Sequence, residues 1–180
     1  TFIGNPNPAF SYGFSINGSY KRFDFTAFFQ GVSHVDAFNA LEYRTEASYF
    51  QPFNRTKRSF EQRWHGEGTS NTYPRIIYDD PNNNSRISSR YVESASYMRM
   101  RNIQIGYSLP KSVLSRMKIE NLRFYVAAQN LLTFTSYHGL DPEMGVGQSE
   151  GNSDTNNDLG IDRGMYPQHK TVMLGLNLTF

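Results

Sequence analysis

The feature that most constrains this chain is the strict alternation of its final segment, residues 169–180. One parity is apolar throughout, and a period of two predicts a strand with one apolar and one polar face. The apolar positions are Val172, Leu174, Leu176, Leu178 and Phe180. Termini of soluble domains usually fray into solvent. A strand that ends on an aromatic residue therefore favours a transmembrane β-barrel, in which the apolar face meets lipid and the polar face meets the lumen.

The composition supports the same fold class. Aromatic residues make up 15% of the chain, yet the mean hydropathy is −0.60, a combination that alternating strands joined by long polar loops produce. No apolar run reaches the length of a membrane-spanning helix, about 18 residues, and the first residues predict no signal peptide. Without cysteine, the chain has no disulfide scaffold, thiolate metal site or cysteine nucleophile. A net charge of +2 gives no basic field for nucleic acid.

Alternation predicts five strands, and therefore an all-β, antiparallel fold. The predicted strands are residues 10–17, 20–31, 96–109, 121–133 and 168–180. The Asn17-Gly18 dipeptide predicts a two-residue hairpin turn between the first two strands. That turn would pair Phe14 with Lys21 and place both apolar sets on the same face of the sheet. In the third strand Arg99 and Arg101 fall on the apolar parity, which a membrane tolerates only near its interface.

The connections alternate between short and long, and the long loops are residues 32–95 and 134–167. Because neighbouring strands are antiparallel, the long loops gather at one end. Outer-membrane barrels have this asymmetry, with short periplasmic turns and long extracellular loops, so Phe180 would lie on the periplasmic side. Within the first long loop we expect short helices at residues 36–42, capped by Asp36, and at 54–64. A short strand is expected at residues 88–92.

A soluble antiparallel sandwich shows the same alternation. The alternative interpretation is therefore a soluble β-rich glycan-binding module without transport activity. Five strands cannot close a membrane barrel, because the smallest have about eight. On the barrel interpretation, residues 1–180 are the C-terminal part of a larger outer-membrane barrel domain.

The long loops supply the candidate substrate contacts. Aromatic rings among polar side chains suit a sugar or a peptide, although such rings also serve to pack loops together. The candidates are Trp64, Tyr73, Tyr78, Tyr91, Tyr137 and His138. On the polar parity of the strands, Arg22, Asp24, Arg123 and Gln129 are predicted to face the lumen.

Neither an enzyme nor a resident cofactor is expected. The four histidines are scattered, and the chain has no H-E-x-x-H motif and no G-x-S-x-G elbow. Asp154, Asn156 and Asp158 resemble the first half of a calcium loop, with oxygen ligands at alternate positions. The glycine is displaced from its usual place and the final glutamate is missing, so calcium is only a weak candidate there.

Several blocks of the sequence resemble one known family, and they occur in the right order. They are IGNPNPAFSYGFSINGSYKRFDFTAFFQG, RISSRYVESASYMRMRNIQIGYSLPKSVL, LRFYVAAQNLLTFTSYHGLDPE and GIDRGMYPQHKTVMLGLNLTF. These blocks are similar to the C-terminal barrel segment of the SusC/RagA family of TonB-dependent outer-membrane transporters. The resemblance covers nearly the whole chain.

The resemblance implies a barrel of about 22 strands with a plug, in the outer membrane of a Gram-negative bacterium. It further implies a SusD-like surface lipoprotein that caps the barrel, and import of oligosaccharides or peptides with energy passed through TonB. TonB would act through an N-terminal part that lies outside this sequence. The apolar face of the terminal strand, Val172 to Phe180, also resembles the signal that the barrel assembly machinery recognises.

Overall fold

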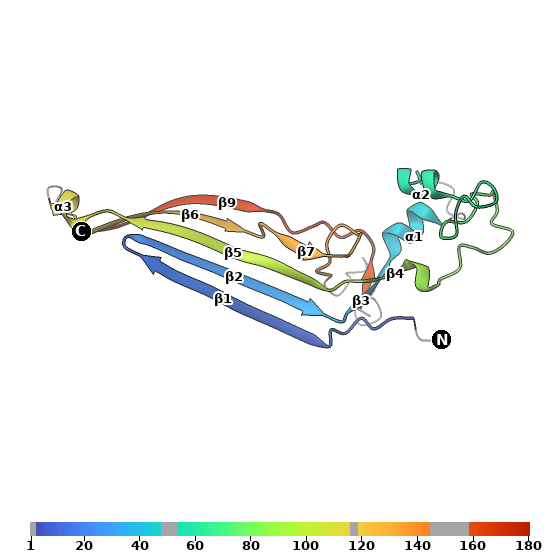
Figure 1. Ribbon diagram of the computed structural model, residues 1–180, viewed down its shortest axis with the longest axis horizontal. Coiled ribbons are helices and arrows are strands. Elements are labelled where there is room, and N and C mark those ends of the chain that lie inside the picture. Colours follow the sequence, from blue (N-terminus) through green and yellow to red (C-terminus); the bar gives the residue numbers. More distant parts are fainter. Residues whose placement is uncertain (1–2, 48–53, 116–118, 145–158) are drawn as a thin grey trace, which may run out of the picture. The chain divides into compact units, whose positions relative to one another are not determined.

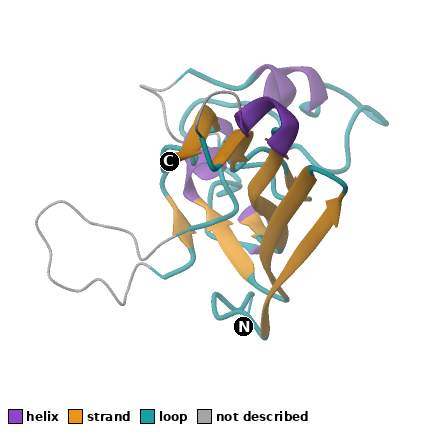
Figure 2. Cartoon of the chain, turned by 90° about the vertical axis from the view of Figure 1, so that its left-hand side faces the viewer, coloured by secondary structure: helices purple, strands orange, loops and turns teal. Residues whose placement is uncertain are grey.

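The computed structural model describes residues 3–47, 54–115, 119–144 and 159–180. Its strands pair mostly antiparallel and its helices are short, which confirms the all-β class (Figure 2). The chain forms two compact units. The sheet unit comprises Pro8–His34, Ser96–Ser136 and Pro167–Phe180, and the loop unit comprises Thr1–Asn7, Val35–Ala95 and Tyr137–Tyr166. Among the described residues, no helix has the length and apolar character needed to cross a bilayer.

The sheet unit is built from long antiparallel strands that hydrogen-bond in the order β1-β2-β5-β6-β9 (Figure 1). Its strands are β1 Phe10–Tyr20, β2 Phe23–Ser33, β5 Tyr97–Ser108, β6 Asn121–Gln129, β7 Thr133–Thr135 and β9 Thr171–Thr179. A single helical turn, α3 Lys111–Leu114, lies between β5 and β6. The predicted fourth strand is split into β6 and β7, because Asn130 adopts a positive φ of 52°. β7 then continues the pairing along β5.

The short and the long connections of the sheet unit lie at opposite ends of its strands. At one end, Tyr20 pairs with Phe23 next to the tight turn between β1 and β2, and Asn121 pairs with Thr179. Every segment that leads to the loop unit leaves from the opposite end, where Ser33 pairs with Phe10. The predicted separation of short and long connections is therefore confirmed.

The hairpin between β1 and β2 turns later than the Asn17-Gly18 motif predicts. The ladder continues to a two-residue turn at Lys21-Arg22, in which Lys21 has a φ of 55°. The longer ladder opposes Phe14 to Phe29, and their stacked rings have centroids 5.0 Å apart. The predicted turn is wrong because cross-strand aromatic pairs stabilise the longer ladder, and this gain outweighs the local preference of Asn-Gly. Because the register moves by an even number of residues, the predicted faces stay correct.

A β-bulge in β5 also changes the prediction for the two arginines of that strand. The pairing of β2 with β5 shifts between Phe28 and Phe29, which leaves Arg101 as the extra residue on β5. Residues before a bulge change faces relative to those after it. Met100 therefore pairs with Phe29 on the apolar face, and Arg99 moves to the polar face. The predicted apolar placement of Arg99 is wrong, because counting by parity assumes an unbroken strand.

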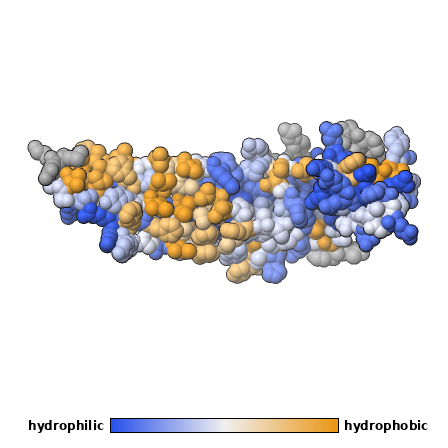
Figure 3. Space-filling view, turned by 45° about the horizontal axis from the view of Figure 1, so that its top comes forward, coloured by the Kyte–Doolittle hydropathy of each residue, from blue (hydrophilic) through white to orange (hydrophobic). Residues whose placement is uncertain are grey.

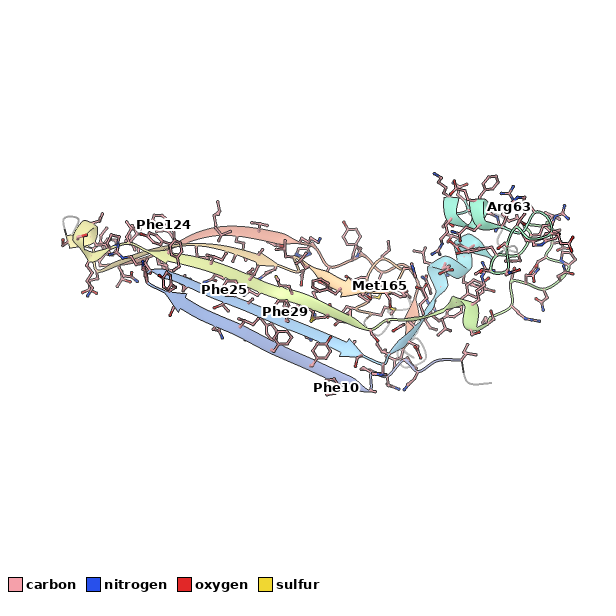
Figure 4. All side chains as sticks on the ribbon, in the orientation of Figure 1. Phe10, Phe25, Phe29, Arg63, Phe124 and Met165 are labelled. Atoms are coloured by element: carbon pink, nitrogen blue, oxygen red, sulfur yellow. The ribbon has the colours of Figure 1, made fainter. Side chains whose placement is uncertain are left out.

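One face of this sheet is apolar from β1 to β9. The register aligns apolar residues in rows across the strands, and Figure 4 labels Phe25 and Phe124 from two of these rows. One row is Phe25, Ile105, Val126 and Leu174, and the next is Phe23, Tyr107, Phe124 and Leu176. Leu174 is 81% exposed. Figure 3 shows apolar side chains gathered over these strands, which is the reverse of the burial expected around a water-soluble core.

The loop unit contains a small sheet of strands in the order β4-β3-β8 together with short helices. Its elements are β3 Asp36–Asn39, α1 Ala40–Glu46, α2 Lys57–Gln62, a 3-10 turn Ser89–Tyr91, β4 Val92–Ser94 and β8 Ile161–Asp162. Tyr91 is fully buried and meets the ring of Tyr43 edge-on, with centroids 5.1 Å apart. Aromatic rings therefore form much of this unit's core.

The first helix of the loop unit begins later than predicted. Asp36 is not its cap but the first residue of β3, and its carboxylate accepts a hydrogen bond from the Asn5 N–H at 3.0 Å. The cap of α1 is Asn39, whose Oδ1 accepts from the Glu42 N–H at 2.8 Å. Asparagine and aspartate cap helices equally well, so the pairing of residues 36–38 with β4 decides between them. Helix α2 lies inside the predicted range, while the predicted strand 88–92 is mostly the 3-10 turn.

Candidate functional site

The polar face of the sheet carries a bidentate ion pair between strands that are not neighbours. Arg123 on β6 donates from Nε and Nη2 to Oδ1 and Oδ2 of Asp24 on β2, with 2.8 Å between Nε and Oδ1. The guanidinium passes over Gly106 on β5, where any Cβ would collide with it. Of the four predicted lumen residues, the structure brings together Asp24 and Arg123, while Arg22 lies in the β1–β2 turn and Gln129 pairs with Thr171.

The arginines at the bulge are held by polar neighbours. Arg99 is 2% exposed, and its Nε donates to Thr133 Oγ1 at 3.0 Å. Arg101 donates to Gln30 Oε1 and to Asn130 Oδ1, both at 3.3 Å. These contacts explain why the sheet accepts two cations that parity alone would place against lipid.

A cluster of carboxyl groups occupies the interior of the loop unit. Glu93 accepts from Asn39 Nδ2 at 2.9 Å, and its Oε2 lies 2.9 Å from the backbone N and 2.8 Å from Nδ1 of His138. Burial, with a hydrogen bond to Glu93, raises the pKa of Glu42 to about 8. Arg58 lies 3.2 Å from Glu42 and favours its charged form, but burial and the adjacent carboxylates outweigh it.

Glu93 behaves in the opposite way. Burial acts to raise its pKa, but the hydrogen bonds from Asn39, Glu42 and His138 outweigh burial, so the pKa lies below the ordinary value. Near neutral pH, Glu42 therefore carries the proton of this pair and Glu93 the negative charge.

Two further buried acids fix the loops around this cluster. Glu46 is 3% exposed and accepts hydrogen bonds from Arg58 Nη2 at 3.0 Å and from Thr56 Oγ1 at 2.6 Å. Asp162 is 1% exposed and accepts from the Tyr137 hydroxyl at 2.6 Å and from the Gly164 N–H at 2.8 Å. Burial and the bond to Asp162 raise the pKa of Tyr137. These contacts join segments distant in sequence and hold the loop unit together.

A polar cavity of about 560 Å³ opens in the loop unit. It is lined by Trp64, Ser70, Asn71, Thr72, Tyr73, Pro74, Arg75, Ile77, Asn82, Asn84, Arg86, Ser88 and Arg90. The backbone N–H of Trp64 donates to the backbone carbonyl of Tyr73 at 2.9 Å, which closes the loop between these residues. Small-molecule sites typically have about 300–1,000 Å³, so the cavity has the size of a ligand site.

Some of the predicted substrate contacts lie at the cavity or the surface, and the others are used inside the loop unit. Trp64 and Tyr73 line the cavity, and Tyr78 is 80% exposed. Tyr91 and Tyr137 are buried, and the ring of His138 contacts Glu93. Sequence reasoning missed the three cavity arginines, Arg75, Arg86 and Arg90. No local charge signal marks them, because the residues that follow Trp64 also include acids, such as Asp79 and Asp80.

The calcium candidates Asp154, Asn156 and Asp158 lie outside the described residues. Within residues 3–47, 54–115, 119–144 and 159–180, no group of three or more histidine or carboxylate side chains could hold a metal ion.

Comparison with known proteins places the chain among bacterial receptors, although no protein-family model matches it. It is 36% identical to TonB-dependent receptor P3 of Formosa agariphila, over 99% of this chain and 17% of that receptor. It is 33% identical to TonB-dependent receptor SusC of Bacteroides thetaiotaomicron over 95 residues, 52% of this chain and 8% of SusC. The solved RagAB peptide importer in its closed-closed state matches with a TM-score of 0.78 and 26% identity, over 99% of this chain and 18% of that chain. The chain thus spans less than a fifth of the length of these relatives.

Proposed function

Because the chain belongs, as a segment, to the SusC/RagA family of TonB-dependent receptors, we propose that it forms part of an outer-membrane nutrient importer. The observation that carries this proposal is the apolar face of the sheet, continuous over five paired strands and opposite a polar face. Strands with this two-sided character suit a wall between lipid and a polar lumen. The importer is not an enzyme, and its function needs no resident cofactor.

Each face of the sheet has a role in this proposal. The apolar residues Val172, Leu174, Leu176, Leu178 and Phe180 would meet lipid and give the barrel assembly machinery its C-terminal signal. The polar face, with the ion pair of Asp24 and Arg123, would line the lumen. The loop unit would lie on the extracellular side, and Phe180 on the periplasmic side.

The importer would work with two protein partners. A SusD-like lipoprotein would cover the extracellular side, and TonB would act through the N-terminal part of the receptor. Both an oligosaccharide and a peptide fit as cargo: one solved neighbour is a peptide importer, and Trp64 and Tyr73 in the polar cavity suit either ligand.

The test is uptake in the bacterium that carries the full-length receptor. Cells grown on mixed oligosaccharides or on mixed peptides are compared with cells that lack the receptor gene and with cells that lack TonB. We expect both deletions to abolish growth on the same nutrient class and the restored receptor gene to recover it. Unimpaired growth of the receptor-deleted cells on both nutrient classes would contradict import.

Fractionation separates the proposal from its alternative, a soluble glycan-binding module. The importer must stay in the outer-membrane fraction until detergent is added. Recovery of the full-length protein in the soluble periplasmic fraction without detergent would favour the soluble module.

A further inference from the structure

The cavity of the loop unit is lined by fixed charges of one sign. Arg75, Arg86 and Arg90 contribute to its wall, and the lining contains no aspartate or glutamate. Like charges that share a cavity repel one another, and together they raise the local concentration of anions. An anion that enters the cavity is therefore stabilised by all three side chains.

Within the described part of the chain, these charges are not paired with acids. Among the residues that the structure describes, no ion pair joins Arg75, Arg86 or Arg90 to a carboxylate. Asp80, an acid in the same stretch of chain, uses its carboxylate to accept the N–H groups of Asn84 at 3.0 Å and Ser85 at 2.7 Å. That carboxylate shapes the turn and does not line the cavity.

Arg90 is held by aromatic rings instead of an acid. Its guanidinium lies 4.7 Å from the ring centroid of Tyr73 and 5.3 Å from that of Tyr91. Its Nη2 is buried and has no hydrogen-bond partner. Stacking on a ring fixes the plane of a guanidinium but leaves its charge uncompensated.

The remaining lining adds groups that can bind an uncharged part of a ligand. Trp64 is 37% exposed and offers an apolar surface. Amide and hydroxyl side chains from Asn71, Asn82, Asn84, Ser70 and Ser88 add donors and acceptors. The arginine guanidinium groups, the polar side chains and the ring of Trp64 together suit a polar ligand that carries an acidic group.

We propose that this cavity binds a carboxylate group of the imported molecule. The planar fork of arginine matches a carboxylate in two parallel hydrogen bonds, and Trp64 would contact the adjoining sugar ring or peptide. The inference rests on the proposed import function and narrows its cargo to acidic molecules. Carboxylates occur on acidic sugars and on acidic peptides, and the two sources are separated by experiment.

The experiment measures binding by calorimetry with the full-length receptor and its lipoprotein in detergent. The probes are trigalacturonate, its neutral counterpart trigalactose, an amidated tri-aspartate peptide and an amidated tri-asparagine peptide. We expect one acidic probe to bind at least about ten-fold more tightly than its neutral counterpart, since charge-assisted hydrogen bonds are stronger than neutral ones. Whichever acidic probe binds identifies the source of the carboxylate.

Variants then locate the binding. Arg75 and Arg86 are exposed, so the double variant Arg75→Gln/Arg86→Gln should fold normally. Its affinity for the acidic probe should fall by about ten-fold or more, while its affinity for the neutral probe stays unchanged. The charge-matched control is Lys57→Gln/Arg63→Gln, since neither residue lines the cavity. Arg63, labelled in Figure 4, lies over the ring of Phe60 at 3.9 Å. Arg90→Lys keeps the charge but removes the fork, and should weaken binding without abolishing it.

Three results would overturn the inference. They are equal binding of acidic and neutral probes, an equal loss in the charge-matched control, and an unchanged affinity in the double cavity variant. Because binding is measured without TonB or energy, these results leave the import proposal standing. Conversely, a failed uptake test with intact carboxylate binding would overturn import and not the cavity's preference.

Discussion

In the sheet unit Leu174 is 81% exposed, whereas in the loop unit Glu46 is 3% exposed. The other buried polar residues show the same difference between the two units. The buried polar residues of the loop unit are Asn39, Glu46, Ser59, Ser85, Asp141 and Asp162, while Arg99 is the one in the sheet unit among the described residues. The sheet unit gains its cohesion from backbone ladders, and the loop unit from a small core crossed by side-chain hydrogen bonds.

In the proposed outer-membrane receptor, this difference between the units corresponds to two solvents, lipid around the sheet and water around the loops. A strand in lipid satisfies its backbone within the sheet and can present any apolar side chain outward. An irregular loop cannot pair its backbone in ladders, so buried acids such as Asp162 must hold its turns. Substitutions should therefore be judged by face in the sheet unit and by hydrogen-bond partner in the loop unit.

The sharpest test of this contrast is Leu174→Arg in the full-length receptor. Leu174 is highly exposed on the apolar face, and a charge in the bilayer mid-plane costs a barrel about 2–4 kcal/mol. We expect a fall of that size in the free energy of unfolding, measured by urea titration in lipid vesicles. The control is Met173→Arg, one residue away on the polar face, which should be tolerated. Equal losses at the two positions would contradict the assignment of faces.

The next largest effect should come from the polar face. In Gly106→Ala the new methyl group collides with the side-chain ends of Arg123 and Asp24, so the ion pair must shift and weaken, at a cost of about 0.5–1 kcal/mol. Unfolding in urea measures the change. Gly18→Ala, where a Cβ meets nothing within 4 Å, is the matched control and should be neutral or mildly stabilising. If both glycines tolerate alanine equally, the ion pair contributes little to the sheet.

The smallest effect should be a pH dependence confined to the loop unit. Because the pKa of Glu42 is raised to about 8, its contribution to stability is full below about pH 4.5 and is lost as the pH rises through about 8. Hydrogen exchange of α1, corrected for the intrinsic rate, should therefore quicken above pH 8 while β5 stays protected. Glu42→Gln, which mimics the protonated acid, should remove this dependence. Its persistence in the variant would assign the titration to another group.

Much of the sheet follows from the sequence because its information is local. Period-two alternation predicted the five long strands and the apolar face of residues 172–180, and an even register shift left the faces intact although the turn moved to Lys21-Arg22. Local motifs were weaker guides. The turn is not at Asn17-Gly18 because β1 and β2 pair over a longer ladder. Asn39 and not Asp36 caps α1 because Asp36 pairs with the distant strand β4.

The candidate site depends still more on tertiary structure. Trp64 and Tyr73 were predicted as loop aromatics, but nothing local says that they share a cavity with Arg75, Arg86 and Arg90. Tyr91 and Tyr137 have the same composition signal and are buried instead. An aromatic ring in a loop can pack against other side chains or bind a ligand. Only its neighbours in the folded structure decide between these roles.

The sequence by itself determined the fold class, the two faces of the strands and the end at which the long loops gather. These properties repeat every two residues or follow from antiparallel order, so they can be read along the chain. Tertiary structure alone decided the bulge at Arg101, which moved Arg99 to the polar face, and the bond between Asp24 and Arg123 across 99 residues. A bulge and a long-range ion pair depend on residues that folding brings together, and no local sequence pattern identifies those residues.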